Sequence, residues 1–278
     1  MMLRSENVQL IEGLDHPECV CVGPDGSLYA GGEDGQLDRF TAEGERIRVG
    51  CTEGFLLGIA IDGRGRVHAC DLARKAVVRI DPNGAIIQRS NGPADRRLEV
   101  PNYPVFDVEG RLFVSDSGDY WSRTGTGRIL VVEPDNTTRT FHAGPFRFAN
   151  GLAVSPDGCW LYIAQSTASD VVRVALDRAD GPIERTHRLP DSSVPDGLAF
   201  THDGRLLIAC YKPDAIFLGE RDGTVRLLHE DPTGELLNRP TNVALHEGQL
   251  YVANLGGWHI TRIATDLQPG PVQRPQLP

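Results

Sequence analysis

The sequence predicts an all-β protein, a six-bladed β-propeller with four antiparallel strands per blade and a ring closed by an N-terminal strand. Short runs of β-branched and aromatic residues alternate with turns rich in Gly and Pro, of which the 278 residues contain 31 and 19. Helical periodicity is hard to find anywhere in the chain. One pattern, an apolar run, a turn ending in Gly and a second apolar run, occurs six times, as CVCVGPDGSLYA, GIAIDGRGRVHA, PVFDVEGRLFVS, GLAVSPDGCWLYIA, GLAFTHDGRLLIA and NVALHEGQLYVA.

The spacing of these six hairpins indicates the architecture. Their turn glycines are separated by 39, 45, 48, 46 and 44 residues and are Gly26, Gly65, Gly110, Gly158, Gly204 and Gly248. A period near 45 residues with about four short strands is typical of a propeller blade. A β-sandwich gives no reason for equal spacing. Six units of about 45 residues account for nearly all of the 278 residues, so we expect a single propeller domain over residues 1–278.

Further strands are expected between the hairpins. They are predicted at residues 36–40, 46–49, 76–80, 85–88, 128–132 and 137–142. The sixth unit has an outer strand at residues 259–264 but only a Pro-rich tail after it. Its fourth strand must come from elsewhere in the chain, and residues 8–11 are the predicted donor.

The charge and the lengths of the apolar runs limit the classes of partner that the protein can bind. Asp and Glu outnumber Lys and Arg by 38 to 28, and a net charge of −10 gives no electrostatic basis for nucleic-acid binding. No apolar run approaches the roughly 18 residues of a membrane span, and the N-terminus lacks the apolar core of a signal peptide. We therefore expect a cytoplasmic protein with no membrane partner and with its six cysteines reduced. The oligomeric state is not specified.

Polar residues recur at one point of the hairpin repeat. Eight residues before each turn glycine, at the start of the first strand, stand Glu18, Leu57, Asn102, Asn150 and Asp196, and matching TNVAL to DGLAF adds Thr241. About six residues after the glycine stand Gly32, Asp71, Asp116, Gln165, Cys210 and Asn254. In an antiparallel hairpin the start of one strand lies beside the end of the next, so both sets are predicted at one rim of the central channel.

The chemistry of these positions favours a hard cation. None of the twelve is Lys or Arg, and Glu18 and Asp196 would repel each other in a constricted channel unless a cation sits between them. Oxygen ligands favour Ca²⁺ over Mg²⁺ or Mn²⁺, with Zn²⁺ less natural. The alternative is that these side chains only hydrate the channel opening or cap strand ends.

Other catalytic signatures are absent from the sequence, which contains no G-x-S-x-G, P-loop, H-E-x-x-H or C-x-x-C motif. A Ser or Cys hydrolase is therefore disfavoured. We predict that two loops with aromatic residues extend from this rim and line a pocket. They are residues 115–121 (SDSGDYW) and 254–259 (NLGGWH).

The sequence resembles the SMP-30/gluconolactonase/luciferin-regenerating-enzyme family of six-bladed propellers, also called regucalcin-like. The resemblance covers almost the whole chain and is carried by HPECVCVGPDGSLY, VPNYPVFDVEGRLFVSDSG, FANGLAVSPDG and VPDGLAFTHDG. It implies that Glu18, Asn150 and Asp196 hold one divalent cation, that Asn102 contacts substrate or metal, and that Asp196 is the catalytic base. Members acting on sugar lactones often carry Arg at the position of Val100, so this departure favours a more apolar lactone or ester.

The predicted function is metal-dependent lactone hydrolysis of the gluconolactonase type. A cation polarises the carbonyl, and Asp196 removes a proton from the attacking water. Alternatively the cation lowers the pKa of that water, and Asp196 or Asp116, which we predict to contact substrate, only orients it. Three other functions stay open: aryl esterase or organophosphate hydrolase activity on the same centre, a non-catalytic calcium- or ligand-binding propeller, and a strictosidine-synthase-like condensation.

Overall fold

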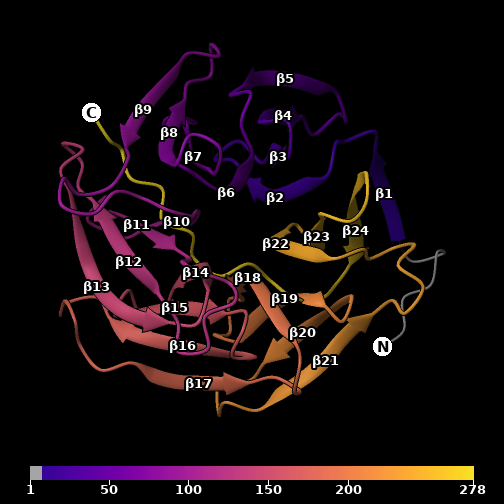
Figure 1. The fold of residues 1–278 in the computed structure, drawn as a ribbon. Coiled ribbons are helices and arrows are strands. Elements are labelled where there is room, and N and C mark those ends of the chain that lie inside the picture. Colours follow the sequence, from indigo (N-terminus) through magenta and orange to yellow (C-terminus); the bar gives the residue numbers. More distant parts are fainter. Residues whose placement is uncertain (1–7) are drawn as a thin grey trace.

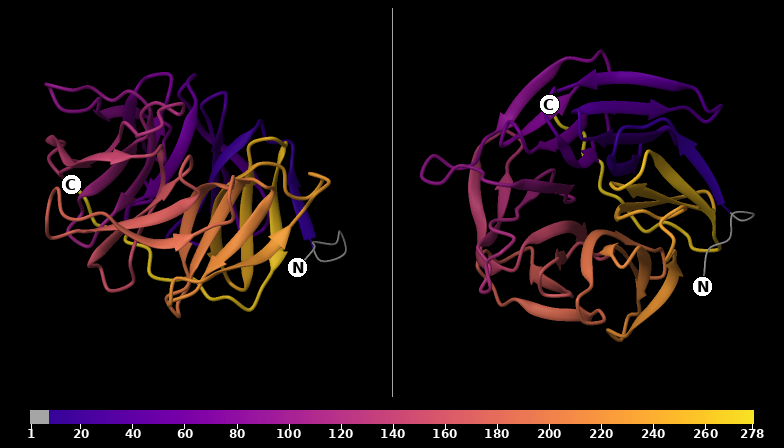
Figure 2. Two further views of the ribbon diagram at one scale, coloured as in Figure 1. Left: turned by 60° about the horizontal axis from the view of Figure 1, so that its bottom comes forward. Right: turned by 45° about the vertical axis from the view of Figure 1, so that its right-hand side comes forward.

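The protein forms a ring of six four-stranded antiparallel sheets around a central channel, as predicted (Figures 1 and 2). This computed structural model describes residues 8–278.

Five of the blades are formed by consecutive strands. Blade 1 contains β2 (Pro17–Val22), β3 (Leu28–Gly32), β4 (Gln36–Phe40) and β5 (Arg46–Cys51), and blade 2 contains β6 (Leu56–Ile61), β7 (Val67–Asp71), β8 (Ala76–Ile80) and β9 (Ile86–Ser90). Blade 3 contains β10 (Pro101–Phe106), β11 (Leu112–Asp116), β12 (Gly127–Val132) and β13 (Thr138–Phe146). Blade 4 contains β14 (Ala149–Val154), β15 (Trp160–Gln165), β16 (Asp170–Ala175) and β17 (Glu184–Arg188), and blade 5 contains β18 (Val194–Phe200), β19 (Leu206–Lys212), β20 (Ala215–Gly219) and β21 (Val225–Glu230).

Blade 6 closes the ring with strands from both ends of the chain. It contains β22 (Pro240–His246), β23 (Gln249–Asn254), β24 (His259–Ala264) and, as its outer strand, β1 (Val8–Glu12). Val8 lies opposite Ile263, and Glu12 lies opposite His259. The predicted N-terminal closure is confirmed.

The first strand of every blade lines the channel, and the core fills the spaces between blades. Within residues 8–278 the buried apolar side chains form six clusters, each drawn mainly from two adjacent blades, so that every junction in the ring has its own cluster. At the junction of blades 3 and 4, for example, Phe113 and Phe141 pack with Leu152 and Ile163. The burial of apolar surface at each junction therefore holds neighbouring blades together.

The cysteines are unpaired, as the sequence predicts. All six of them, each within residues 8–278, are free thiols. No helix in this part of the chain is long and apolar enough to cross a membrane.

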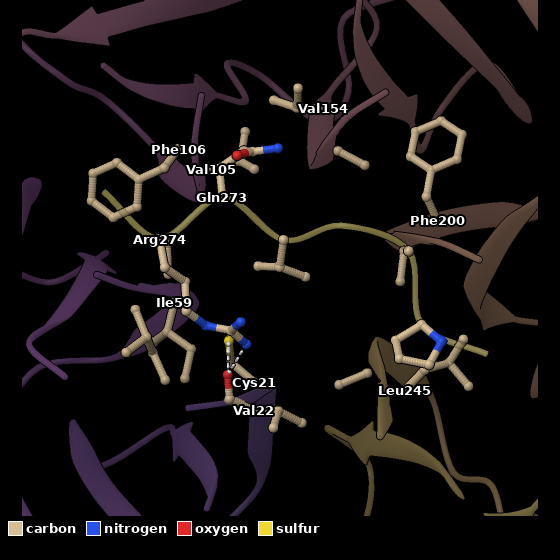
Figure 3. Close-up of a pocket in the computed structure, with 18 of the residues that line it drawn as sticks. Cys21, Val22, Ile59, Val105, Phe106, Val154, Phe200, Leu245, Gln273 and Arg274 are labelled. Atoms are coloured by element: carbon tan, nitrogen blue, oxygen red, sulfur yellow. Dashed lines mark hydrogen bonds between the residues drawn. The ribbon is translucent and has the colours of Figure 1, made fainter. Parts of the chain in front are cut away.

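The C-terminal tail after β24 crosses the end of the channel where the hairpin turns lie (Figure 3). On blade 5, the amide of His202 donates to the carbonyl of Gln268 (2.8 Å), and Gly270 donates to Phe200 (2.9 Å). On blade 2, the amide of Gly63 donates to the carbonyl of Pro275 (2.9 Å). The tail thus ties together blades that are not neighbours in the ring.

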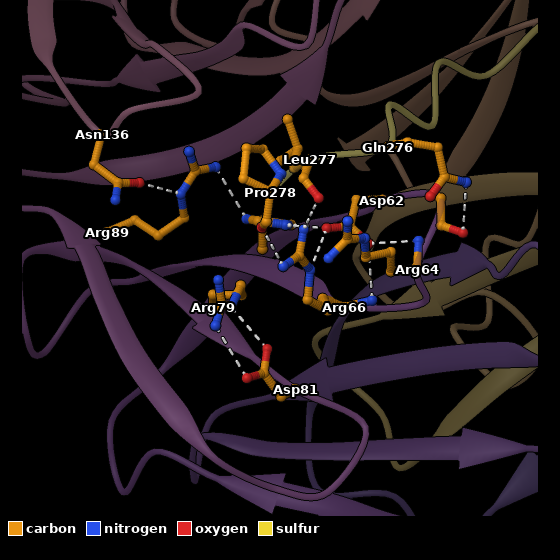
Figure 4. Close-up of polar contacts among 12 residues, drawn as sticks. Asp62, Arg64, Arg66, Arg79, Asp81, Arg89, Asn136, Gln276, Leu277 and Pro278 are labelled. Carbon is orange, nitrogen blue, oxygen red and sulfur yellow. Dashed lines mark hydrogen bonds and ion pairs between the residues drawn. The ribbon is translucent and has the colours of Figure 1, made fainter.

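A charged cluster on blade 2 holds the last residues of the tail (Figure 4). The Arg66 guanidinium donates to the main-chain oxygens of Leu277 (3.0 Å) and Pro278 (2.7 Å), and its Nε pairs with Asp62 at 2.7 Å. The same carboxylate accepts from His68 Nε2 at 3.1 Å. Arg89 donates to Nδ1 of that ring at 3.1 Å, so His68 is neutral with its proton on Nε2.

We predict that His68 makes the protein acid-sensitive. Burial is the main cause that lowers the pKa of His68 to about 4, with the nearby charge of Arg89 acting in the same direction. The unfolded chain takes up this proton near pH 6.5, whereas the folded protein does so only near pH 4. The free energy of unfolding should therefore fall by about 3 kcal/mol between these pH values on account of His68.

Urea denaturation at several pH values between 7 and 4 measures this effect. His68→Gln should show a shallower loss of stability with acid than the wild type. His202→Gln, at an exposed histidine, is the control and should follow the wild type. Equal slopes for His68→Gln and wild type would show that His68 is not the group concerned.

Candidate metal centre

The two predicted sets of rim residues lie at the same end of the channel. In five blades the first pair of residues in the ladder between the first two strands joins the residue before the inner-strand position to the second-strand position. Examples are Pro17 with Gly32, Pro101 with Asp116, and Ala149 with Gln165. In blade 5 the equivalent pair, Pro195 with Cys210, is the second pair of the ladder. The inner-strand residue therefore directly follows this pair in every blade and stands near the start of the channel-lining strand.

Close contact between blades at this level brings these positions together. A Cβ atom on Gly151 would lie 2.3 Å from the carbonyl oxygen of Asp196, and one on Gly197 would lie 2.6 Å from that of Thr241. Real Cβ atoms essentially never approach other atoms so closely. The glycine that follows Asn150, and the one that follows Asp196, therefore let inner strands of adjacent blades meet at their backbones.

Hydroxyl groups fix the heads of the inner strands to the neighbouring blades. Ser115 Oγ donates to the carbonyl of Asn150 (2.8 Å), and Ser166 Oγ donates to that of Pro195 (2.8 Å). Thr241 Oγ1 donates to the carbonyl of Glu18 (2.7 Å), which links blade 6 to blade 1. The backbones that carry Glu18, Asn150 and Asp196 are held by these bonds before any ligand binds.

Glu18 and Asp196 carry two buried carboxyl groups that interact electrostatically. Their side chains belong to residues that are 8% and 7% exposed. Burial raises the pKa of Glu18 well above its ordinary value, and the charge of Asp196 raises it further. Burial likewise raises the pKa of Asp196, while a hydrogen bond from Asn150 acts in the opposite direction. Neither carboxyl group forms an ion pair with a basic side chain among residues 8–278.

Unpartnered oxygen atoms surround these carboxyl groups. Glu18 Oε2, Asn150 Oδ1 and Asn242 Oδ1 are buried without a hydrogen-bond partner in the described chain. Such atoms are rare, because burying an acceptor without a donor costs free energy. No group of three or more His, Cys, Asp or Glu side chains within residues 8–278 is arranged to hold a metal ion. The oxygen-only set of two carboxylates and amides nevertheless fits a hard divalent cation.

Asn242 was missed by the sequence analysis, which assigned the sixth position to Thr241. The register confirms that Thr241 matches Asn150, but its hydroxyl is used in the bond to Glu18. Asn242 stands where blades 4 and 5 have the glycines, and it adds an amide to the cluster. The signal was the Asn in TNVAL at the place of Gly in DGLAF.

Asn102 is buried on blade 3 at the level of the other inner-strand residues. The next residue is Tyr103, whose ring atom Cδ2 would lie 2.6 Å from a Cβ on Gly58. Burial raises the pKa of Tyr103, with an opposing contribution from Asn242 on the other side of the channel. Tyr103 therefore keeps its hydroxyl protonated, and its ring contributes to the lining of the channel.

Asp116 lies at the same rim but is engaged elsewhere. Its Oδ1 accepts from the amides of Glu99 (3.1 Å) and Val100 (2.7 Å), and its Oδ2 is paired with the buried Arg128 at 2.9 Å. Both carboxylate oxygens are thus used to hold the loop that leads into β10. The structure does not join Asp116 to the cluster of Glu18, Asn150 and Asp196.

Other members of the second-strand set also hold loops. Gln165 Oε1 accepts from the amide of Arg147 (2.8 Å), two residues before β14. Asn254 Oδ1 accepts from the amide of Asn238 (2.9 Å), two residues before β22. The two sets therefore share a rim, but Asp116, Gln165 and Asn254 of the second set serve to hold the segment that leads into the inner strand.

Aromatic residues stand above this rim on the predicted loops. The Trp258 indole, 57% exposed, lies against the His16 ring at 4.6 Å, and Tyr120 packs on Phe148 at 5.0 Å. His16 and Phe148 precede Glu18 and Asn150 by two residues and have positive φ angles of 37° and 58°. A bulky residue in this conformation is strained, and such residues cluster at functional sites.

The fold and the site together define a β-propeller with a polar cluster of two carboxylates and several amides at one end of its channel. The family described as SMP-30/Gluconolactonase/LRE-like region matches residues 93–255, more than half of the chain. The chain belongs to this family. A second family description, strictosidine synthase-like, N-terminal, matches residues 5–40.

Individual relatives are more distant. The chain is 29% identical to lactonase drp35 of Staphylococcus aureus over 125 residues, 43% of this chain and 38% of the relative. It is 26% identical to the 6-deoxy-6-sulfogluconolactonase of Pseudomonas putida over 211 residues, 72% of this chain and 68% of the relative. The match with the staphylococcal lactonases thus spans well under half of their length.

Solved structures agree with the fold. A gluconolactonase from Xanthomonas campestris superimposes with a TM-score of 0.77 at 19% identity, covering 94% of this chain and 89% of the other. The calcium-binding protein regucalcin from Agrobacterium tumefaciens superimposes with the same TM-score at 16% identity, covering 96% and 94%. At these identities the likeness concerns the fold.

We predict that a divalent cation stabilises the wild type through Glu18. Addition of Ca²⁺ should raise the melting temperature, because binding to the folded state alone adds about 2.7 kcal/mol at one hundred times Kd. Glu18→Gln should melt no lower than the wild type in EDTA, since it removes a repelling buried charge. It should gain little from Ca²⁺.

Differential scanning calorimetry with and without Ca²⁺ tests this, with Mg²⁺, Mn²⁺ and Zn²⁺ in parallel. Glu247→Gln provides the control, since the Glu247 side chain is 84% exposed, lies at a hairpin turn at the other end of the channel and should leave the response to cations as in the wild type. A wild type whose melting temperature is unchanged by all four cations would contradict the candidate centre.

A second prediction concerns the contact between blades 4 and 5. Gly151→Ala should lower the free energy of unfolding by about 1–3 kcal/mol, the usual cost of overpacking, because its methyl group meets the Asp196 carbonyl. It should also weaken Ca²⁺ binding by displacing Asp196. Gly181→Ala adds the same methyl group where the nearest atom is 3.3 Å away, and urea denaturation should show a smaller loss.

Proposed function

We propose that this protein is a divalent-metal-dependent lactonase whose cation, Ca²⁺ in the first place, is held by Glu18, Asn150 and Asp196. The observation that carries the proposal is a pair of buried carboxyl groups that has no basic partner among residues 8–278 and lies next to oxygens without donors. The lactonase names of the relatives and the calcium-binding name of a structural neighbour support it. Asn242 is proposed as a further oxygen donor.

The reaction class follows from what such a centre provides. When bound, a divalent cation polarises a carbonyl and stabilises the negative charge that develops on its oxygen during attack by water. Asp196 is proposed to accept the proton of that water. Asn150 steadies Asp196 through a hydrogen bond, and Thr241 fixes the backbone of Glu18. Asn102, at the same level on blade 3, is proposed to position the lactone ring.

The surroundings favour an apolar lactone. Val100 supplies no charge for sugar hydroxyls, and its amide is occupied by Asp116. The rings of Trp258, Tyr120 and Phe148 stand above the entrance to the channel. A substrate with an apolar ring or side chain should therefore bind more tightly at this channel entrance than a polyhydroxylated one.

We predict that Asp196→Asn and Asn102→Ala affect different kinetic constants. If Asp196 is the base, Asp196→Asn should lower kcat by roughly 100-fold or more at saturating Ca²⁺, the scale of general-base catalysis. Asn102→Ala should act mainly on KM, because it removes a positioning contact and leaves both carboxyl groups in place.

The assay measures acid release from a panel that includes an alkyl-substituted γ-lactone, glucono-1,5-lactone and an aryl ester, with and without EDTA. The alkyl lactone should be the best substrate, and EDTA should abolish turnover. Recovery of near-wild-type kcat by Asp196→Asn at high Ca²⁺ would assign Asp196 to cation binding alone. Binding of Ca²⁺ without turnover of any substrate would favour the non-catalytic calcium-binding propeller.

A further inference from the structure

A cavity lies in the channel toward the hairpin turns, the end away from the candidate metal centre, and Tyr103 is part of its lining. It has a volume of about 330 Å³, at the lower end of the range for pockets that hold small molecules. Its wall is apolar and comes from the later residues of the inner strands of all six blades: Val20, Ile59, Val105, Val154, Leu198 and Val243. The wall begins two residues beyond Glu18, Asn150 and Asp196, so the cavity and the centre occupy different layers of the channel.

The C-terminal tail forms the floor of this cavity (Figure 3). Residues 269–274 run across the channel and contribute to the lining. The floor is fixed on one side by the bond between Gly270 and Phe200 and on the other by the bonds from Gly63 and Arg66. The cavity is therefore bounded by chain that is anchored at both ends.

Arg274 brings a positive charge into this apolar space. Its Nη2 donates to the carbonyl of Val22 at 2.8 Å, and its Nε is buried without a partner in the described chain. In Figure 3 the side chain leaves the tail and points toward Cys21 and Val22. A buried guanidinium N–H without an acceptor is costly and is normally satisfied by a bound group.

Nothing that lines the cavity neutralises this charge. Among the described residues the lining contains neither Asp nor Glu. The Cys21 thiol is close to Arg274 but is not a counter-ion, because burial raises its pKa to about 11. Tyr103 and His246 are the other titratable side chains of the lining, and His246 lies beside the first hairpin turn, 3.1 Å from a Cβ placed on Gly26. The cavity thus offers one cation and a large apolar wall.

We propose that this cavity binds a small amphipathic carboxylate, with the carboxylate on Arg274 and the hydrocarbon chain against the valine, isoleucine and leucine side chains of the inner strands. A guanidinium fork matches a carboxylate, and a single negative charge balances the single cation. The volume suits a straight chain of roughly eight carbons. The site is independent of the lactonase proposal and uses none of its residues.

Isothermal titration of the whole protein with octanoate in the presence of EDTA tests the proposal. Acetate carries the charge without the chain, and 1-octanol carries the chain without the charge. We expect one octanoate per protein, bound at least tenfold more tightly than either probe. The absence of octanoate binding, or equal affinity for octanoate and octanol, would overturn the proposal.

Two variants locate the ligand. Arg274→Gln should weaken octanoate binding at least tenfold and leave octanol unchanged. Val272→Phe, at a half-exposed tail residue that lines the cavity, should weaken both ligands by reducing the volume. Octanoate affinity that is unaffected by both substitutions would place the ligand elsewhere.

Two control variants distinguish the charge of Arg274 from the order of the tail and from the candidate metal centre. Arg66→Gln loosens the end of the tail without touching the cavity, and it should keep its octanoate affinity. Loss of binding in Arg66→Gln to the same extent as in Arg274→Gln would show that an ordered tail, and not the charge of Arg274, is what matters. Asp196→Asn should bind octanoate like the wild type, and loss of binding there would place octanoate in the candidate metal centre instead.

Discussion

The backbone contact between adjacent inner strands is the constraint on which the candidate centre depends. Polar side chains on three or more blades can meet only if the blades approach closely at that level, and a side chain on Gly151 or Gly197 would prevent the approach. The serine and threonine hydroxyls that bridge the blades hold the same level together. Two carboxyl groups then lie in a space from which water is largely excluded, where their repulsion opposes folding. This arrangement is an example of a site that costs stability.

The rim is divided between residues that face the channel and residues that hold its entrance. Asp116, Gln165 and Asn254 use their oxygens to accept from backbone amides just before the inner strands. By fixing those loops they set where each inner strand begins, and so where Asn102, Asn150 and Thr241 stand. Their effect on chemistry is therefore exerted through position.

Much of the architecture is predictable because it repeats. The turn glycines and alternating apolar runs express local requirements that every blade shares, so six copies reinforce one another, and even the strand borrowed from the N-terminus follows from a count of strands. The same repeat places Glu18, Asn150 and Asp196 at one level, while the family resemblance is what distinguishes them from the other residues at that position.

Features that depend on a single three-dimensional contact could not be found in this way. Asp116 is one of the twelve rim positions, and its partner Arg128 comes from the neighbouring strand β12. Arg128 is not one of the twelve, so the repeat did not indicate this ion pair. Asn242 replaces a glycine in one blade only, and Thr241 is turned to the Glu18 carbonyl. The Pro-rich tail has no periodicity, and nothing local in PVQRPQLP indicates that it crosses the channel.

The closure of blade 6 has a consequence for how the chain is made. Val8 pairs with Ile263, so β1 is synthesised well before its partner strand β24 and has an uncovered edge in the meantime. Contacts of such long sequence separation are slow to form, and an unpaired strand edge invites pairing with other chains. During synthesis the open ring would expose β1 and the unfilled junction between blades 6 and 1. The need for molecular chaperones should accordingly be greatest just before β24 emerges.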